Sequence, residues 1–405
     1  MPSVRNLSAP MGAQSVAGRS VEADAAASLT IVVPTCNRYP YLLRLLKYYQ
    51  ACGAPMRMHI LDSSRHAQPG QAIERLITTL AISYTRYDAG LEPIPMIHDG
   101  VKRVTTPYVV LWADDDFLVP KAVAAAAQFL DAHRDFRVAH GVGGIFTIRP
   151  STHGPAELDI GPYLQCSVLD ATASSRLVTY LTTRYSIFYS VYRTPELQQN
   201  LDQSVAHGFG HFWEELARSW LFAIQGKAKK LDGLYIMRQM SHDSQGDGWY
   251  PKRGSHAFSW VTMPSFPGHC DRFLECVARA LAQQDGMSFS RAREFAEELF
   301  WGYLARVLAM DWTRRYEQPS QRLWARLRAA VRNVPMARNA WRAARSVLPG
   351  GNHELSLASL RRPSSPYHDS FAPIYQAITE EEPAMIADEA AAPLHRPDQT
   401  PCARE

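Results

Sequence analysis

Three adjacent aspartates are the first group of residues whose types and spacing suggest chemistry. Asp114, Asp115 and Asp116 follow the apolar run Tyr108–Trp112, which predicts a buried strand. Neighbouring carboxylates repel one another, and a bound cation relieves that repulsion. Because Mg²⁺ and Mn²⁺ prefer oxygen ligands, the triplet predicts a divalent-metal site. The alternative is a solvated acidic loop, or an aspartate cap for the helix that Pro120 would begin.

A second acidic pair, Glu214 and Glu215, begins a predicted helix over Phe212–Ile224 that Gly226 is placed to end. A carboxylate within hydrogen-bond reach of a hydroxyl can take its proton, so this pair offers a general base. Coupled acids in a cleft also raise the pKa of one member toward neutrality. The alternative is that acids in a first turn only favour the helix dipole.

The elements that must position these acids alternate between strands and helices. Strands are expected at Leu29–Val33, Met58–Leu61, Ile82–Tyr87, Tyr108–Trp112, Val138–Ile148, Ile187–Arg193 and Leu231–Met237, and helices at Gln71–Leu80, Ile94–Val104 and Lys121–His133. This alternation predicts an α/β fold of βαβ units, with a mostly parallel sheet and helices on both faces.

Polar residues follow three of these strands. Thr35 and Arg38 follow the first strand, Asp62 ends the second, and the aspartate triplet follows Tyr108–Trp112. In open α/β sheets, ligands bind beyond the carboxyl ends of the strands. The sequence therefore predicts one site built from these three strand ends.

The runs Thr30-Ile-Val-Val-Pro-Thr-Cys-Asn-Arg38, Ile60-Leu-Asp62 and Thr106-Pro-Tyr-Val-Val-Leu-Trp-Ala-Asp-Asp-Asp-Phe-Leu-Val-Pro120 resemble the family 2 glycosyltransferases of the GT-A fold, over about residues 28–245. The resemblance implies transfer of a sugar from a nucleotide diphosphate-sugar to an acceptor hydroxyl, in one in-line displacement with inversion.

The resemblance also implies a donor site. Pro34, Thr35, Asn37 and Arg38 would line the base and ribose, and Asp62 would accept a hydrogen bond from the base. That acceptor is expected if the base is uracil, so a UDP-sugar is favoured. A turn in Asp-Ser-Ser is the other use of Asp62.

For the metal, the resemblance matches Asp115 to a ligand, Asp114 to a ribose or metal contact, and Asp116 and His242 to further contacts with the metal or the diphosphate. The cofactor would be Mn²⁺ or Mg²⁺. The motif is shifted, because Ala113 stands where many family members have an aspartate.

For the acceptor side, the resemblance makes Glu215 the general base and Glu214 its neighbour. Family members often have Glu-Asp at this place. The Glu-Glu of this chain would move the base by one methylene.

Outside this region, the expected organisation is a flexible leader at 1–27, the catalytic domain at 28–250, a helical extension at 251–348 and a disordered tail at 349–405. Residues 321–347 interleave arginines with Trp and Leu, which suits peripheral contact with an anionic membrane. A helix docked on the domain with its basic side in water fits as well.

Composition narrows the class of protein. A net charge of +4 is too small to indicate nucleic-acid binding. The six cysteines are scattered without metal-site spacing, and no run approaches a membrane span, so we expect a cytoplasmic protein, at most peripheral to a membrane.

These features together predict a metal-dependent, inverting glycosyltransferase in glycan or polysaccharide synthesis. The acceptor would be a polysaccharide, a lipid-linked glycan or a protein, and without a Gln-x-x-Arg-Trp pattern one sugar per binding event is expected. A nucleotidyltransferase is one alternative, although the loop Thr-Cys-Asn-Arg after the first strand has no glycine. A non-catalytic glycan-binding scaffold is the other.

Overall fold

The computed structural model describes residues 27–53, 56–65, 69–149, 157–183, 186–240, 257–316 and 355–391. Its strands are β1 (Leu29–Thr35), β2 (Arg57–Asp62), β3 (Ser83–Arg86), β4 (Tyr108–Leu111), β5 (Phe117–Leu118), β6 (Phe136–Arg149), β7 (Glu157–Tyr163), β8 (Val191–Arg193) and β9 (Lys227–Gln239). Its helices are α2 (Tyr39–Cys52), α3 (Gln71–Thr79), α4 (Pro93–Lys102), α5 (Pro120–Ala132), α6 (Ala173–Thr183), α7 (Thr194–Ala206), α8 (His211–Gln225), α9 (Ala257–Val261), α10 (Phe266–Asp285), α11 (Phe289–Tyr316), α14 (Leu357–Leu360) and α15 (His368–Ala391).

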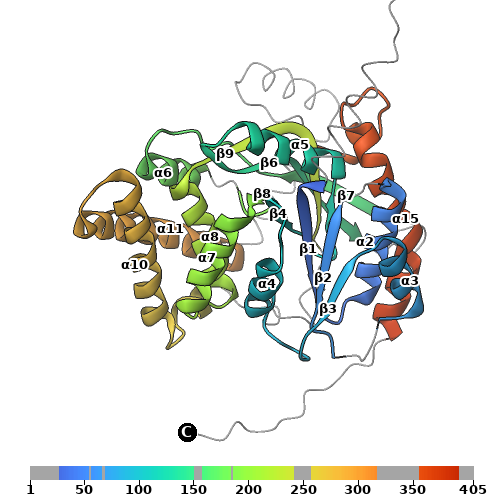
Figure 1. Ribbon diagram of the computed structural model, residues 1–405, viewed down its shortest axis with the longest axis horizontal. Coiled ribbons are helices and arrows are strands. Elements are labelled where there is room, and N and C mark those ends of the chain that lie inside the picture. The colour runs from blue at the N-terminus through green and yellow to red at the C-terminus, as the bar shows by residue number, and fades with distance from the viewer. Residues whose placement is uncertain are drawn as a thin grey trace, which may run out of the picture.

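The strands form a single sheet in the order β3-β2-β1-β4-β8-β6-β9-β5, with β7 paired to β6. The first four strands in this order are parallel, as the alternation of strands and helices predicts. Beyond β4 the sheet is mixed: β8 runs antiparallel to β4 and β6, and β6 pairs parallel with β9. The predicted α/β fold is confirmed (Figure 1).

Helices cover both faces of the sheet because alternate strand side chains point to opposite sides. In β1, Ile31 and Val33 enter a core with Leu45 of α2, whereas Val32 enters a second core with Met96 of α4. Ile31, Val32 and Val33 are thus three successive apolar residues, which is typical of a parallel strand buried on both faces.

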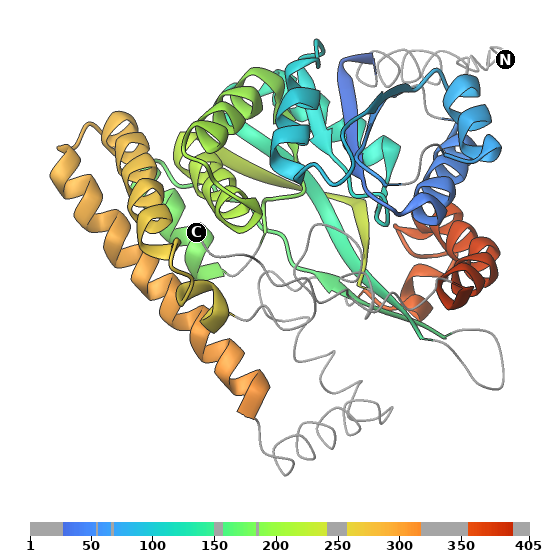
Figure 2. The same cartoon turned by 90° about the horizontal axis from the view of Figure 1, so that it is seen from below.

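The helical extension is a pair of long helices, α10 and α11, that packs on α8 at one end of the molecule (Figure 2). Aromatic side chains fill this contact: Trp220 of α8 lies edge-on to Phe273 of α10, with ring centroids 5.1 Å apart, and Phe300 of α11 lies 5.6 Å from Phe273. Within the described residues, no helix is both long and apolar enough to cross a membrane.

The C-terminal part corrects one expectation. Residues 349–405 are predicted to be disordered, yet α14 and α15 lie there, and α15 packs against α2 (Figure 1). Phe371, Ile374 and Ile378 are buried, at the i, i+3, i+7 spacing of one helix face. The Pro-, Ala- and Glu-rich composition hides this sparse apolar stripe. Residues 1–26 and 321–347 lie outside the described residues.

Candidate active site

The three predicted strand ends lie together. Thr35, the last residue of β1, donates from Oγ1 to Asp114 Oδ2 at 2.8 Å, and its carbonyl accepts from the backbone N–H of Ser63 at 3.1 Å. Asn37 has the left-handed φ of 57°, a conformation that asparagine tolerates, and its backbone N–H donates to Ser64 Oγ at 2.7 Å. These bonds fix the loops after β1, β2 and β4 against one another. Pro34 lies within β1, beside Leu61, and therefore directly precedes this junction.

The three aspartates point to two different arginines. Arg38, the residue before α2, contacts Asp114 Oδ1 at 3.1 Å and Asp115 Oδ2 at 2.6 Å. Asp116 instead contacts Arg238 Nε at 3.3 Å and accepts the backbone N–H of Gln239 at 2.8 Å. The triplet thus ties the start of α2 to the end of β9.

A buried arginine that the sequence analysis missed completes this cluster. Arg44 of α2 is 1% exposed, and its Nη2 donates to the Asp115 carbonyl at 2.9 Å and to Gln239 Oε1 at 2.5 Å. Burial lowers the pKa of Arg44 to about 10, although the charge of Asp115 opposes the shift. The signal in the sequence is a charged residue among the apolar positions of the buried face of α2.

Burial also changes the aspartates. It raises the pKa of Asp114 to about 6 although Arg38 opposes the shift. It raises the pKa of Asp116 to about 7, with the charge of Asp115 adding to the effect and Arg238 opposing it. Burial at the end of β4 therefore favours the neutral forms of these two carboxyl groups.

The fit of a divalent metal can be judged from these contacts. Among the described residues, no three acidic, histidine or cysteine side chains are grouped to hold a metal ion. Asp115 has the most exposed side chain of the triplet, at 11%. One or two carboxylates together with substrate phosphates are the usual protein ligands of Mg²⁺. The donor set therefore fits a cation that arrives with a diphosphate. His242, the predicted additional ligand, lies outside the described residues.

Asp62 is held at the end of β2 by four donors. Its Oδ2 accepts from Tyr39 at 2.8 Å, from Arg86 at 2.7 Å and from Tyr84, and its Oδ1 accepts the Ser64 N–H at 2.8 Å. Burial alone would raise the pKa of Asp62, but these hydrogen bonds hold it below its ordinary value. Asp62 is fully buried and organises this cluster, so its contact with a base stays a prediction.

The two glutamates of α8 differ sharply in their surroundings. Glu214 is 1% exposed and forms an ion pair with Arg218 one turn along the helix, with Nε–Oε1 at 2.9 Å and Nη2–Oε2 at 3.1 Å. Burial raises the pKa of Glu214, opposed by Arg218. Glu215 is half-buried. Glu215 is therefore the more accessible of the two glutamates.

A chain of aromatic contacts joins the two acidic groups. Arg238, the partner of Asp116, lies over the ring of Tyr189 at 4.4 Å and donates to its hydroxyl at 3.1 Å. The Tyr189 ring lies 5.1 Å from that of Phe188, and Arg218, the partner of Glu214, lies over Phe188 at 4.0 Å.

Tyr163 lies beside the same chain, with its ring 6.2 Å from Tyr189. Burial raises the pKa of the Tyr163 phenol, and the charges of Glu215 and Asp116 raise it further. We call Tyr163, Phe188 and Tyr189 the aromatic wall. Through the contacts of Arg238 with Tyr189 and of Arg218 with Phe188, the two acidic groups border one wall, although 99 positions separate Asp116 from Glu215 in the sequence.

No protein-family model matches this chain, and no curated protein matches it. Among solved structures, the chain is similar to residues 1–349 of TarS from S. aureus, with a TM-score of 0.43 and 13% identity over 89% of this chain and 91% of that one. The same segment of TarS in complex with UDP-GlcNAc gives a TM-score of 0.43 and 16% identity, over 89% and 92% of the two chains. The mannosyltransferase PcManGT from Pyrobaculum calidifontis, in complex with GDP-Man and Mn²⁺, gives a TM-score of 0.36 and 14% identity, over 81% and 92%.

Proposed function

We propose that this protein is a glycosyltransferase that moves a sugar from a nucleotide diphosphate-sugar to an acceptor hydroxyl. One observation carries the proposal: the aspartate triplet after β4 and the glutamate pair of α8 border the same aromatic wall through Arg238 and Arg218. A transferase of this kind needs one charged group at the leaving diphosphate and a separate base at the acceptor. The sequence motifs that resemble family 2 glycosyltransferases supply both.

On the donor side, the loop of Pro34, Thr35, Asn37 and Arg38 would bind the base and ribose, with UDP as the favoured nucleotide. Arg38 and Arg238 flank the triplet and are the cations best placed to meet a diphosphate. A divalent metal held through Asp115, with Asp114, Asp116 and His242 as further contacts, would neutralise the charge that develops on the leaving diphosphate.

Charge balance predicts how the metal binds. The three aspartates are matched in number by three arginines beside them, Arg38, Arg44 and Arg238. Free Mn²⁺ therefore finds little net attraction at the cluster. A nucleotide-sugar diphosphate balances the charge of the cation, so we expect the two to bind together.

On the acceptor side, Glu215 would take the proton of the attacking hydroxyl. Glu214 would hold Arg218 in place under Phe188, and so support the aromatic wall. Sugar rings present apolar faces that pack on aromatic side chains, which places the acceptor against this wall. Displacement from the face opposite the leaving group would invert the configuration at the transferred carbon.

Several finer features are proposed from the sequence: one sugar per binding event, and a polysaccharide, lipid-linked glycan or protein as acceptor. The cytoplasmic location and the membrane contact through residues 321–347 belong to the same set of proposals.

A thermal-shift screen tests the proposal. UDP, GDP, CDP and dTDP are each added with and without Mn²⁺ to the wild type, to Asp115→Ala and to the control Asp271→Ala, whose side chain is 69% exposed on α10. We expect one nucleotide to raise the melting temperature only with Mn²⁺, because a ligand that binds the folded state stabilises it by mass action. Mn²⁺ alone should have little effect. Asp271→Ala should keep the response and Asp115→Ala should lose it.

Two results would reject the proposal. No stabilisation by any nucleotide at millimolar concentration would favour a non-catalytic scaffold. Release of pyrophosphate rather than nucleoside diphosphate during turnover would indicate a nucleotidyltransferase.

A further inference from the structure

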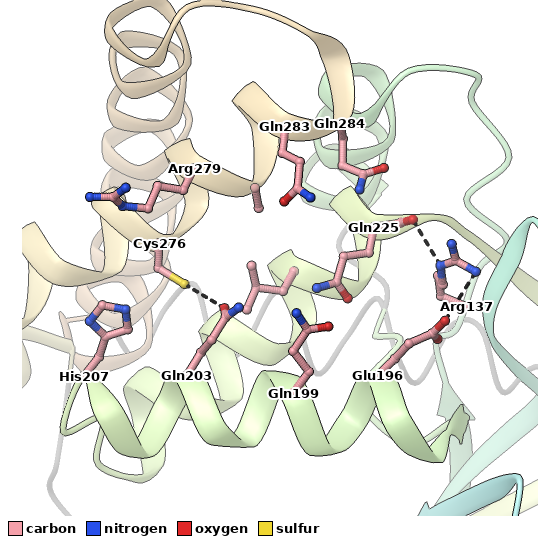
Figure 3. Close-up of a pocket in the computed structure, with 12 residues that line it drawn as sticks. Arg137, Glu196, Gln199, Gln203, His207, Gln225, Cys276, Arg279, Gln283 and Gln284 are labelled. Carbon is pink, nitrogen blue, oxygen red and sulfur yellow. Dashed lines mark hydrogen bonds and ion pairs between the residues drawn. The ribbon is translucent and has the colours of Figure 1, made fainter.

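A cavity lies between α7, the end of α8 and α10 (Figure 3). Its volume is about 410 Å³, within the usual range of small-molecule sites. Its lining is rich in side-chain amides, which come from five glutamines: Gln199, Gln203, Gln225, Gln283 and Gln284.

This cavity is separate from the candidate active site. The aspartate triplet follows the carboxyl end of β4. The cavity is lined instead by Arg137, at the start of β6, and by Gln225, just before β9. Both β4 and β6 run antiparallel to β8, so they run in the same direction. The amino end of β6 therefore lies at the opposite end of the strands from the triplet, which follows the carboxyl end of β4.

The charges around the cavity are balanced within the protein. Arg137 lies 3.4 Å from Glu196, and its Nε donates to the Gln225 carbonyl at 3.2 Å. Arg279 lies 2.5 Å from Glu275. Each arginine of the lining therefore already has a carboxylate beside it, which favours a neutral ligand over an anionic one.

The amides, in contrast, have capacity for a ligand. Gln225 is occupied by a reciprocal pair of hydrogen bonds with Asn200, at 2.8 and 3.1 Å. Gln203 accepts from the Cys276 thiol at 3.4 Å, which leaves its NH₂ group as a donor. Figure 3 shows Gln283 pointing from α10 toward Gln199 and Gln203 of α7. Within the described part of the chain, Gln283 and Gln199 make no side-chain hydrogen bond.

The remaining residues of the lining restrict the chemical class of the ligand further. Glu196 Oε2 is a buried acceptor without a hydrogen-bond partner among the described residues, and it adds an acceptor to the amide donors. His207 carries the one aromatic ring among the described residues that line the cavity, so hydrogen-bonding groups dominate the lining. Each amide offers donors and an acceptor, which matches hydroxyl groups that both donate and accept.

We propose that this cavity is a second carbohydrate site, which binds neutral sugar units of the acceptor glycan at a distance from the point of transfer. The proposal rests on the proposed function for the identity of the glycan, and on the cavity itself for the sugar chemistry. A sugar held here would keep a long acceptor on the enzyme between transfers.

Saturation-transfer NMR tests the proposal with the methyl glycosides of glucose, galactose, mannose and N-acetylglucosamine as probes. The proteins are the wild type, the double variant Gln203→Leu/Gln283→Leu, and the control Gln71→Leu in α3. Leucine has nearly the volume of glutamine and a good helix propensity, so the helices should persist. We expect at least one glycoside to bind to the wild type. In the glutamine variants, each lost hydrogen bond should weaken the affinity for that glycoside roughly fivefold. Because Gln283 is exposed, its single variant remains a test if the double variant is unstable.

The Asp115→Ala variant separates this proposal from the proposed function. Sugar binding that survives in Asp115→Ala and falls in the glutamine variant supports the cavity, even if no sugar transfer is ever detected. Binding that disappears in Asp115→Ala and persists in the glutamine variant would place the sugar in the active site and overturn the proposal. No binding of any glycoside to the wild type would identify the cavity as a water-filled gap, also overturning it.

Discussion

Replacing Glu214 and Glu215 by glutamine, one at a time, separates a structural carboxylate from a catalytic one. The two substitutions are matched in size and change in charge, and they differ only in position on α8. Glu214 faces Arg218 at 2.9 Å with both side chains almost fully buried, whereas Glu215 is half-buried near the aromatic wall. We therefore expect opposite patterns of stability and activity.

The magnitudes follow from burial. Removing one partner of a buried ion pair costs about 3–5 kcal/mol, because the other charge is left unpaired. At roughly 2 °C per kcal/mol for a chain of this size, Glu214→Gln should lower the melting temperature by about 6–10 °C. Glu215→Gln removes no fully buried charge, and its effect on melting should be small. Loss of a general base instead reduces turnover by about 10²–10⁴-fold.

The assay measures melting temperature and turnover on the same preparations, with turnover recorded as release of nucleoside diphosphate well below the melting range of each variant. Glu215→Gln should melt close to the wild type and be nearly inactive. Glu214→Gln should be unstable but keep most of its activity at low temperature. An inactive Glu214→Gln with wild-type stability, beside an active Glu215→Gln, would refute this assignment of the base.

Three further predictions test the fold around the site. Burial lowers the pKa of His140 to about 3 against an ordinary value of 6.5, so the unfolded chain takes up a proton first. The stability that the neutral His140 ring contributes is complete above pH 6.5 and is lost as the pH falls toward 3. The midpoint of urea unfolding should therefore drop less between pH 7.5 and pH 5 in His140→Asn than in the wild type. An equal drop in the wild type and the variant would contradict this. Phe371→Ala in α15 should cost about 3–5 kcal/mol in urea unfolding, since the ring is 1% exposed, and an unchanged midpoint would show that α15 does not contribute to the core. Gly141→Ala would place a Cβ 2.5 Å from the Gly233 carbonyl and push β6 from β9, at a cost of about 1–3 kcal/mol. Gly161→Ala, whose Cβ meets nothing within 4 Å, is the matched control, and equal melting temperatures for the two variants would count against the tight β6–β9 contact.

Much of the first half of the fold could be predicted from the sequence because its signals are local. The strand predicted at Leu29–Val33 appears as Leu29–Thr35, and the helix predicted at Lys121–His133 appears as Pro120–Ala132. Apolar runs, helical spacing and a proline at a first helical turn each act within a few residues. The rule that ligands bind beyond parallel strand ends then placed Thr35 near Asp114 without any coordinates.

The later sheet was less predictable, because its signals are weaker and its partners are distant. The strand predicted at Ile187–Arg193 is only Val191–Arg193, and it runs antiparallel between β4 and β6. Nothing in a single strand states the direction of its neighbours. The burial of α15 on α2 was hidden for the same reason, since three apolar residues in a polar helix matter only once a groove exists to receive them.

The sequence by itself determined which residues carry charge at the strand ends and at the start of α8. Only the tertiary structure decided which charge meets which. It paired the triplet with Arg38 and Arg238 and buried Arg44 beneath it. It also separated Glu214 from Glu215, because adjacent residues on a helix point about 100° apart and the packing of α8 sets which one faces inward. Those pairings depend on contacts between segments far apart in the chain, and a single sequence holds no local signal for such contacts.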